Sequence, residues 1–268
     1  MGIVNITPDS FSDGGLHDDA HAAFAAGMAM VHDGATILDL GAESTRPGAD
    51  AVSADDELAR LLPALELIRP ATEALISIDT SKARVAAAAL VKGADMINDV
   101  RGLRGDPELA HVVADAGVPV VLMHMRGEPR TMQDAPSYED PVQEVLDELQ
   151  ESVDIARGAG ILDSRILLDP GIGFAKRFED NRAILQALDR FVALGFPVVL
   201  GVSRKSLIGR ALQDRDGKVP PPRERDIGTV ALTTEGWRAG VAVHRVHNVR
   251  FACEALRTLE AFGRKNGE

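Results

Sequence analysis

Polar side chains follow each of eight short apolar runs in this 268-residue sequence. They are Asn5, Asp39, Asp79, Asn98 with Asp99, His124, Asp169, the segment GVSRKS at 201–206, and Arg245 with His247. Loops are expected to be polar, but polarity alone does not place an acid, a base or an amide at the end of every run. Together these groups predict one site, built where eight apolar segments end.

The candidate site residues divide by charge. Asp79, Asn98 and Asp169 suit a ligand edge with several N–H donors, such as a 2-amino-pyrimidinone. The cationic set suits phosphate or carboxylate, and it consists of Arg46, Arg204, Lys205, Arg245 and His247. A helix expected to begin near Ser206 would also favour an anion. We therefore expect a rim with an acid–amide half for a planar nitrogen heterocycle and a basic half for a phosphate-type group and a second anionic substrate.

The apolar runs that position these residues are short and rich in Val, Ile and Leu. They lie at 2–6, 35–40, 75–78, 95–100, 118–123, 165–168, 197–202 and 241–246. Near-continuous apolar runs are typical of parallel strands that are buried on both faces. Helix-like segments alternate with them, at 20–33, 54–68, 82–92, 107–116, 141–159, 181–194, 226–239 and 249–262.

This alternation repeats a strand–helix unit eight times, with a mean period of about 33 residues. Eight units predict an α/β fold of the (β/α)₈ barrel type, with residues 1–268 as a single domain. A doubly wound open sheet is the alternative architecture. In a barrel, the carboxyl ends of all eight strands meet at one rim, where active sites are found.

Composition limits the possible partners. The net charge is −12 and the pI is about 5.1, which argues against nucleic acid or an anionic membrane surface as a partner. An anionic substrate therefore needs a local basic cluster. Cys253 is the only cysteine, so an internal disulfide and a cysteine-based zinc site are excluded. With no signal-peptide pattern and no apolar run of about 20 residues, we expect a cytoplasmic protein.

Several motifs identify a resemblance to a known family. NITPDSFSDGG, ESTRPGA, SIDTS, INDV, LMHM, DPGIGFAK, GVSRKS and RVH occur in the order found in the dihydropteroate synthase family. The resemblance runs from residue 2 to about residue 260. Methyltetrahydrofolate methyltransferases share the barrel and the acid–Asn–Asp pattern, but they lack the segments TPDSFSDGG and SRKS.

The resemblance implies a reaction of folate synthesis. Enzymes of this family condense 6-hydroxymethyl-7,8-dihydropterin diphosphate with 4-aminobenzoate, giving dihydropteroate and pyrophosphate. The implied pterin pocket contains Asp79, Asn98, Asp169 and Lys205, with Met123, Phe174 and Gly201 around the ring. Asn5 would help hold Mg²⁺; Thr45, Arg46, Arg245 and His247 would bind the diphosphate; and Arg204, Lys205 and Ser206 would lie near the aminobenzoate. Lys205, Arg245, His247 and Asp79 are the implied catalytic residues, and a homodimer through the late helices is also implied.

The chemistry of these residues favours a dissociative substitution. An aniline nitrogen is a weak nucleophile, so the enzyme is expected to help the diphosphate depart by neutralising its charge. The sequence shows no Ser-His-Asp or Cys-His arrangement for covalent catalysis. Two other functions stay open at this point: a pterin-binding barrel that has lost catalysis, and a methyltetrahydrofolate-dependent methyltransferase.

Some residues allow more than one interpretation. Asp79 and Asp169 could cap helices, and His124 could support the site or only fill space. His244 is expected to face the helical layer, because it alternates with Arg245 along a strand. The sequence departs from the family pattern at three positions: Ala42 and Ala175 replace usual glycines, and Asn248 replaces a usual Asp.

Overall fold

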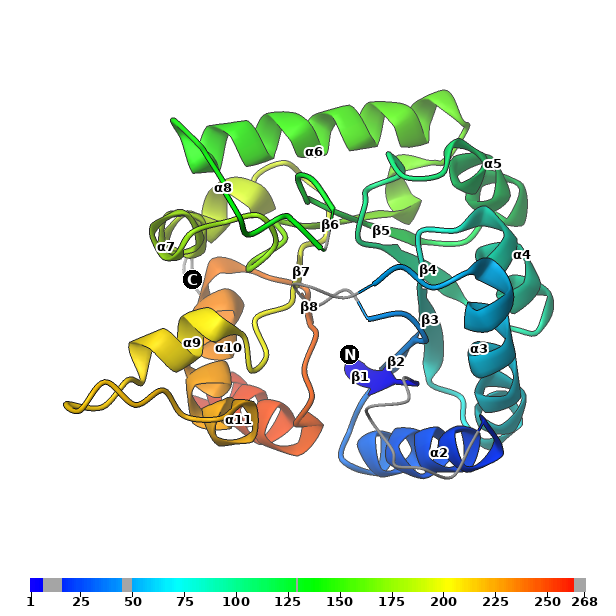
Figure 1. Cartoon of the computed structure of the whole chain (residues 1–268), viewed down its shortest axis with the longest axis horizontal. Helices are drawn as coiled ribbons and strands as arrows, with labels where there is room; N and C mark the ends of the chain where they lie inside the picture. Colours follow the sequence, from blue (N-terminus) through cyan, green and yellow to red (C-terminus); the bar gives the residue numbers. More distant parts are fainter. Residues whose placement is uncertain (7–15, 45–49, 129, 263–268) are drawn as a thin grey trace.

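The eight strands form a closed parallel barrel. A computed structural model of the chain describes residues 1–6, 16–44, 50–128 and 130–262. The strands are β1 (Gly2–Asn5), β2 (Ile37–Gly41), β3 (Leu75–Asp79), β4 (Met96–Asp99), β5 (Val120–Met123), β6 (Ile166–Asp169), β7 (Val199–Leu200) and β8 (Val243–His244). Each lies within or beside a predicted apolar run, and Figure 1 shows them in the middle of a ring of helices.

Hydrogen bonds close the barrel at two places where the sheet ladders stop. β1 to β6 pair in sequence order, and β7 pairs with β8. Between β6 and β7, the Leu168 amide donates to the Pro197 carbonyl at 3.0 Å. Between β8 and β1, the Ile3 amide donates to the Val246 carbonyl, also at 3.0 Å. The predicted barrel is therefore confirmed, and the open-sheet alternative is wrong.

The helices cover the outside of the barrel. They are α2 (Leu16–His32), α3 (Ala54–Ile68), α4 (Ala83–Val91), α5 (Pro107–Ala116), α6 (Pro141–Gly158), α7 (Phe178–Gln186), α8 (Leu188–Val192), α9 (Ser206–Ala211), α10 (Asp226–Ala239) and α11 (Val249–Phe262). Three short 3₁₀ turns are η1 (Arg69–Ala71), η2 (Asp163–Arg165) and η3 (Pro222–Arg225). Four of the predicted helices have the observed bounds.

Two helix predictions were wrong in their extent. α2 begins at Leu16, four residues before the predicted start at residue 20. The segment 181–194 was expected to be one helix, but it forms α7 and α8 with a break at Ala187 (φ −117°, ψ 24°). α7 also begins three residues early, because the Asp180 carboxylate accepts a hydrogen bond from the Arg177 amide at 2.8 Å. That contact satisfies an amide at the helix start that has no partner inside the helix.

Alternation along the strands decides which residues face the barrel interior. Ile37, Met96, Val121, Leu167, Val199 and Val243 belong to one inner apolar cluster with Met1. Two residues further along five of these strands come Asp39, Asn98, Met123, Asp169 and Gly201, and Arg245 follows Val243 in the same way. Since side chains two apart on a strand share a face, the apolar layer supports a polar layer above it. That polar layer lies at the carboxyl ends of the strands.

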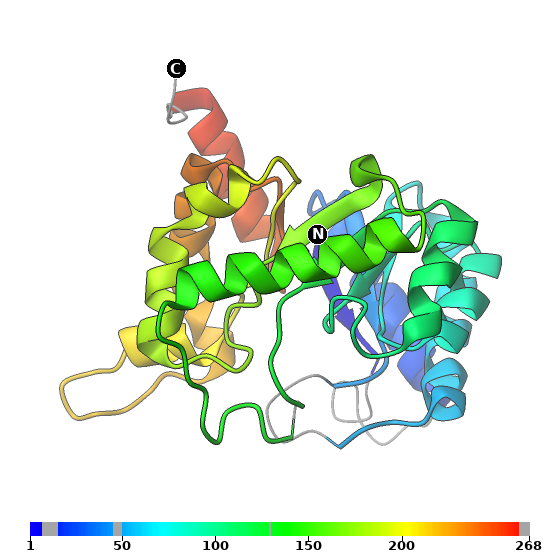
Figure 2. The ribbon, with the colours of Figure 1, turned by 90° about the horizontal axis from the view of Figure 1, so that it is seen from above.

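The outward-facing strand residues pack against the helices. Leu38, Ile78, Ile97 and Leu122 are fully buried in this outer core. His244 faces the same way, as predicted: a Cβ added at Gly236 of α10 would lie 2.9 Å from its ring. The loops after the strands gather at one end of the barrel, the lower end in Figure 2. In the described part of the chain, no helix has the length and apolar character needed to cross a membrane.

Candidate active site

Arg245 lies at the centre of the polar layer, between two carboxylates. Its Nε donates to Asp39 Oδ2 at 2.6 Å, and its terminal nitrogen donates to Asp79 Oδ2 at 2.7 Å. Asn98 Nδ2 donates to the same Asp39 oxygen at 3.2 Å. The other oxygen of Asp39 is buried and has no hydrogen-bond partner among the described residues. One guanidinium therefore holds the ends of β2, β3 and β8 together.

This arrangement changes the expected layout of the rim. The acid–amide and basic residues were predicted to occupy separate halves, but Arg245 of the basic set is paired with Asp79 of the acidic set. The physical reason is burial, because Asp39 and Asp79 are almost inaccessible to solvent and a buried carboxylate needs an opposite charge nearby. Asp39 was noted as a strand-end residue but was not placed in the site, although its alternation with Ile37 could have indicated it.

A second group surrounds Gly201 at the end of β7. A Cβ added there would lie 3.6 Å from Asp169 Oδ2, 3.9 Å from Lys205 Nζ and 4.0 Å from Arg245 Cδ. Asp169 is itself fixed, since its Oδ1 accepts a hydrogen bond from the Gly171 amide at 2.7 Å. The backbone of Gly201 thus leaves room beside an acid and two cations. A planar ligand could lie against it.

Apolar side chains form a wall beside this group. Met123 is buried together with Val100, Met125, Met132 and Ala175, and the half-buried Phe174 packs against them. Lys205 Nζ lies 4.6 Å from the centre of the Phe174 ring. The same Nζ donates to the Ile172 carbonyl. Lys205 therefore links the loop after β7 to the loop after β6.

Burial shifts the pKa of the main titratable groups. It raises the pKa of Asp79, and the nearby Asp39 raises it further while Arg245 opposes the shift. Burial likewise raises the pKa of Asp169, against the lowering effect of Lys205. For Lys205, burial lowers the pKa to about 8, with Asp169 working in the opposite direction. These groups can therefore exchange protons closer to neutrality than ordinary surface residues.

The loop after β7 contains Ser203, which contacts His247 after β8, and Arg204. Ser203 Oγ lies 2.9 Å from His247 Nδ1 and accepts a hydrogen bond from the His247 amide at 3.1 Å. This contact fixes the ring, and Ser203 was not predicted to take part. Arg204 makes two hydrogen bonds to the Asp226 carboxylate, at 2.6 and 2.8 Å. Its guanidinium is therefore engaged with α10, and the expected role near the aminobenzoate has no support in this contact.

Asn248, which replaces a usual Asp of the family, contacts α10 and α11. Its Nδ2 donates to Asp226 at 3.0 Å, and its Oδ1 accepts a hydrogen bond from the Phe251 amide at 3.1 Å. It therefore caps α11 and braces Asp226. Ser203 contacts the ring of His247. The replacement of the usual Asp by Asn248 therefore does not remove the group that orients this histidine.

The remaining predicted residues lie at the rim or beyond the described chain. Ser206 is exposed and begins α9, as predicted. Asn5 ends β1, directly opposite Gly41 in the ladder. Thr45 and Arg46 lie outside the described residues.

Among the described residues, no group of three or more His, Cys, Asp or Glu side chains converges as a metal site. The half-buried Asn5 offers one amide oxygen. Mg²⁺ is often held by one or two protein oxygens together with substrate phosphates and water. A single strand-end amide therefore fits an ion that arrives with a diphosphate.

Comparison with known proteins extends over nearly the whole chain. A family model described as pterin binding enzyme matches residues 1–247. The dihydropteroate synthase of Bacillus subtilis is 45% identical over 267 residues, which cover 100% of this chain and 89% of that protein.

Two solved structures are similar in fold as well as sequence. Dihydropteroate synthase from Clostridium difficile, determined in the presence of pteroic acid, has a TM-score of 0.90 and 42% identity, covering 98% of this chain and 96% of that one. Dihydropteroate synthase from Xanthomonas albilineans with 4-aminobenzoic acid has a TM-score of 0.89 and 46% identity, covering 97% and 91%. The match in fold therefore extends over nearly the whole chain.

Proposed function

This chain belongs to the dihydropteroate synthase family of pterin-binding enzymes, transferases of folate biosynthesis, and from that premise we propose how its residues carry the reaction. The substrates are 6-hydroxymethyl-7,8-dihydropterin diphosphate and 4-aminobenzoate, and the products are 7,8-dihydropteroate and pyrophosphate. The observation that carries the assignment is the cluster at Gly201. There an acid, a lysine and an arginine surround a backbone position without a side chain, beside an apolar wall.

The pterin ring lies in this proposal between Gly201 and the wall of Met123 and Phe174. Asp169 and Asn98 face its N–H donors, because carboxylate and amide oxygens accept hydrogen bonds. With a pKa of about 8, Lys205 is mostly protonated at pH 7 and donates to an acceptor on the ring. Asp79 contributes a carboxyl group whose raised pKa lets it change protonation as the ligand enters.

The diphosphate lies on the basic side. Arg245 and His247 follow β8, and Arg46 and Thr45 belong to the loop after β2. The guanidinium of Arg245 has five N–H donors and uses two of them in its carboxylate contacts, so the others can donate to a phosphate. Asn5 would hold Mg²⁺, which neutralises charge on the diphosphate and so assists its departure.

The reaction is a substitution at the pterin methylene. The bond from the methylene carbon to the diphosphate oxygen breaks, and pyrophosphate leaves with the electron pair. The aniline nitrogen of 4-aminobenzoate then forms the new C–N bond and loses a proton. Asp79 and Asp169 stabilise the positive charge left on the pterin, and Ser206 with Lys205 lies near the aminobenzoate. Arg204 acts by bracing the loop through Asp226.

The proposed dissociative order predicts that pyrophosphate is released from the dihydropterin diphosphate and Mg²⁺ without 4-aminobenzoate. A coupled pyrophosphate assay, with and without the amine, measures this directly. Release that depends strictly on 4-aminobenzoate, with inversion at a chirally labelled methylene, would contradict the dissociative order. No release under either condition would contradict the proposed activity and indicate a barrel that binds pterin without catalysis.

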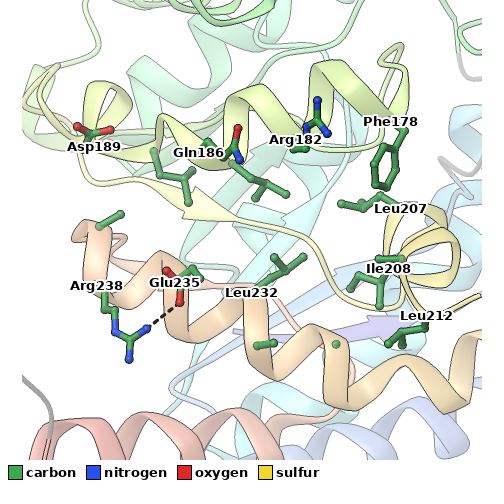
Figure 3. A pocket seen from close by; sticks show the side chains of 16 residues that line it. Phe178, Arg182, Gln186, Asp189, Leu207, Ile208, Leu212, Leu232, Glu235 and Arg238 are labelled. Atoms are coloured by element: carbon green, nitrogen blue, oxygen red, sulfur yellow. Dashed lines mark hydrogen bonds and ion pairs between the residues drawn. The ribbon is translucent and has the colours of Figure 1, made fainter.

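We further propose a homodimer that forms over the late helices, acting in the cytoplasm. An apolar cavity of 790 Å³ lies between α7, α9 and α10, away from the strand ends. Figure 3 shows Leu232 of α10, Leu207 and Ile208 of α9, and Leu212 directly after α9 around it. Close by, Ile227 of α10 is 76% exposed and would extend the apolar surface around this cavity.

If the dimer forms over this face of α10, a charged residue on the face should change the oligomeric state. Ile227→Glu is expected to shift the chain from dimer to monomer in sedimentation velocity, because a buried unpaired charge opposes association. Val91→Glu is the matched control, since Val91 of α4 is 86% exposed on a different side of the barrel. A wild-type chain that sediments as a monomer at micromolar concentration would rule out the dimer.

A further inference from the structure

The side chain of a buried lysine contacts the backbone of the turn after β6. Lys176 is 3% exposed, and its Nζ lies 3.0 Å from the Gly171 carbonyl and 3.0 Å from the Phe174 carbonyl. It also lies 2.8 Å from His124 Nδ1. A longer contact of 3.5 Å joins Nζ to the His124 carbonyl. Three backbone carbonyls and one ring nitrogen thus surround the amine, and the three nearest can accept the three hydrogens of an ammonium group.

Burial lowers the pKa of Lys176 well below the usual value for a lysine, and Asp169 opposes the shift. The three acceptors within 3.0 Å of Nζ favour the ammonium form, and the tautomer of His124 agrees with it. His124 Nε2 lies 3.1 Å from Glu148 Oε2, and Glu148 also accepts a hydrogen bond from Arg126 Nε at 2.7 Å. A carboxylate only accepts, so His124 must donate from Nε2 and present Nδ1 as an acceptor to Lys176. Burial lowers the pKa of His124 to about 4, with Lys176 adding to the effect, which agrees with a neutral ring.

The turn itself has an unusual backbone. Gly171, Gly173 and Ala175 all have positive φ, at 67°, 84° and 48°. This alternation turns successive carbonyls in different directions. The carbonyls of Gly171 and Phe174 accept hydrogen bonds from Lys176. The Ile172 carbonyl accepts one from Lys205, and the Gly173 carbonyl accepts one from Gln133 at 2.7 Å.

We infer that Lys176 is a positioning residue for the pterin site, acting through the carbonyls of the 171–174 turn and held in place by His124. By fixing that turn, it sets where the Ile172 carbonyl holds Lys205 and where the Phe174 ring meets the ligand. This inference rests on the proposed function, because it assigns the pterin to the wall that the turn forms. On the diphosphate side, the guanidinium of Arg245 contacts Asp39 and Asp79, and His247 contacts Ser203; these three partners lie outside the turn.

The dissociation constants of two ligands distinguish a positioning role of Lys176 from a general loss of structure. In Lys176→Met, the dissociation constant of the dihydropterin diphosphate, measured by calorimetry with EDTA in place of Mg²⁺ and no 4-aminobenzoate so that the substrate stays intact, is expected to rise roughly ten- to hundredfold. The dissociation constant of inorganic pyrophosphate is expected to stay within about twofold, because its basic residues keep their partners. Lys92→Met is the matched control, since Lys92 is exposed and pairs with Glu66 on the outside of the barrel.

A pair of histidine variants keeps the test decisive if Lys176→Met does not fold. His124→Asn retains an acceptor near the Nδ1 position for Lys176, whereas His124→Gln retains a donor near Nε2 for Glu148. Only His124→Gln is expected to weaken pterin binding. Equal effects of the two variants, or equal weakening of pterin and pyrophosphate binding, would overturn the inference. Failure of the wild-type chain to bind the dihydropterin diphosphate would instead overturn the proposed function.

Discussion

Arg245→Met is expected to lower the free energy of unfolding by about 3–5 kcal/mol, because it leaves buried carboxylates without their counter-charge. Arg245 is the partner of both Asp39 and Asp79, at 2.6 and 2.7 Å. Methionine fills most of the space of the arginine stem but offers no donor. Urea unfolding followed by circular dichroism measures the loss. In a thermal scan the same loss corresponds to a fall of roughly 10 °C in Tm.

Two further variants test the cause of this loss. Arg250→Met removes an arginine that pairs with Glu254 at 2.9 Å on an exposed helix face, and it should cost less than about 1 kcal/mol. Asp39→Asn combined with Arg245→Met removes one of the stranded charges, and it should recover part of the lost stability. If the double variant is no more stable than Arg245→Met alone, the loss arises from packing and not from charge.

The pH dependence of this variant has a definite sign. Burial raises the pKa of Asp79 in the folded chain above its unfolded value, so the folded chain binds more protons. Its contribution to stability is therefore full below the unfolded pKa, near 4, and is lost as the pH rises through the folded pKa. Arg245 lowers that folded pKa, so removing it extends the loss to higher pH. The destabilisation by Arg245→Met should be larger at pH 8 than at pH 5.

The barrel could be predicted from the sequence because its signal is local. A buried parallel strand requires a run of apolar residues, and a helix end requires a cap that is visible in the chain, such as Asp106 before α5 or Asp140 before α6. The break at Ala187 gave no such signal, since neither Gly nor Pro marks it. It depends on how the segment packs against the barrel, which is a tertiary property.

The site was predictable as a set of residues and less so as a set of contacts. Strand alternation is sufficient to bring Asp79, Asn98, Asp169 and Arg245 to one rim. The pairing of Arg245 with Asp39 could not be read from spacing, because the two residues lie 206 positions apart. The same holds for Ser203 beside His247 and for Lys176 beside His124, where the contact depends on how two loops fold over the barrel.

Gly171→Ala is expected to cost more than about 3 kcal/mol of stability or to abolish pterin binding, because the new methyl group has no space. A Cβ at this position would lie 1.8 Å from the carbonyl oxygen of His124 and 2.9 Å from its carbonyl carbon. Both atoms belong to the backbone at the end of β5, so no side-chain rotation can relieve the overlap. The turn must move as a whole, and it would carry the Phe174 ring and the Ile172 carbonyl away from Lys205.

Gly117→Ala separates this overlap from the cost of the backbone conformation alone. Gly117 has φ of 64°, against 67° for Gly171, but a Cβ there would meet no atom within 4 Å. It should therefore lose only the roughly 1–2 kcal/mol that a left-handed conformation costs an L-residue, and it should bind the dihydropterin diphosphate normally. Thermal unfolding and calorimetry on both variants give the comparison. Equal losses for the two would mean that the turn after β6 can shift without disturbing the barrel, and the wall beside Lys205 would then be adaptable instead of fixed.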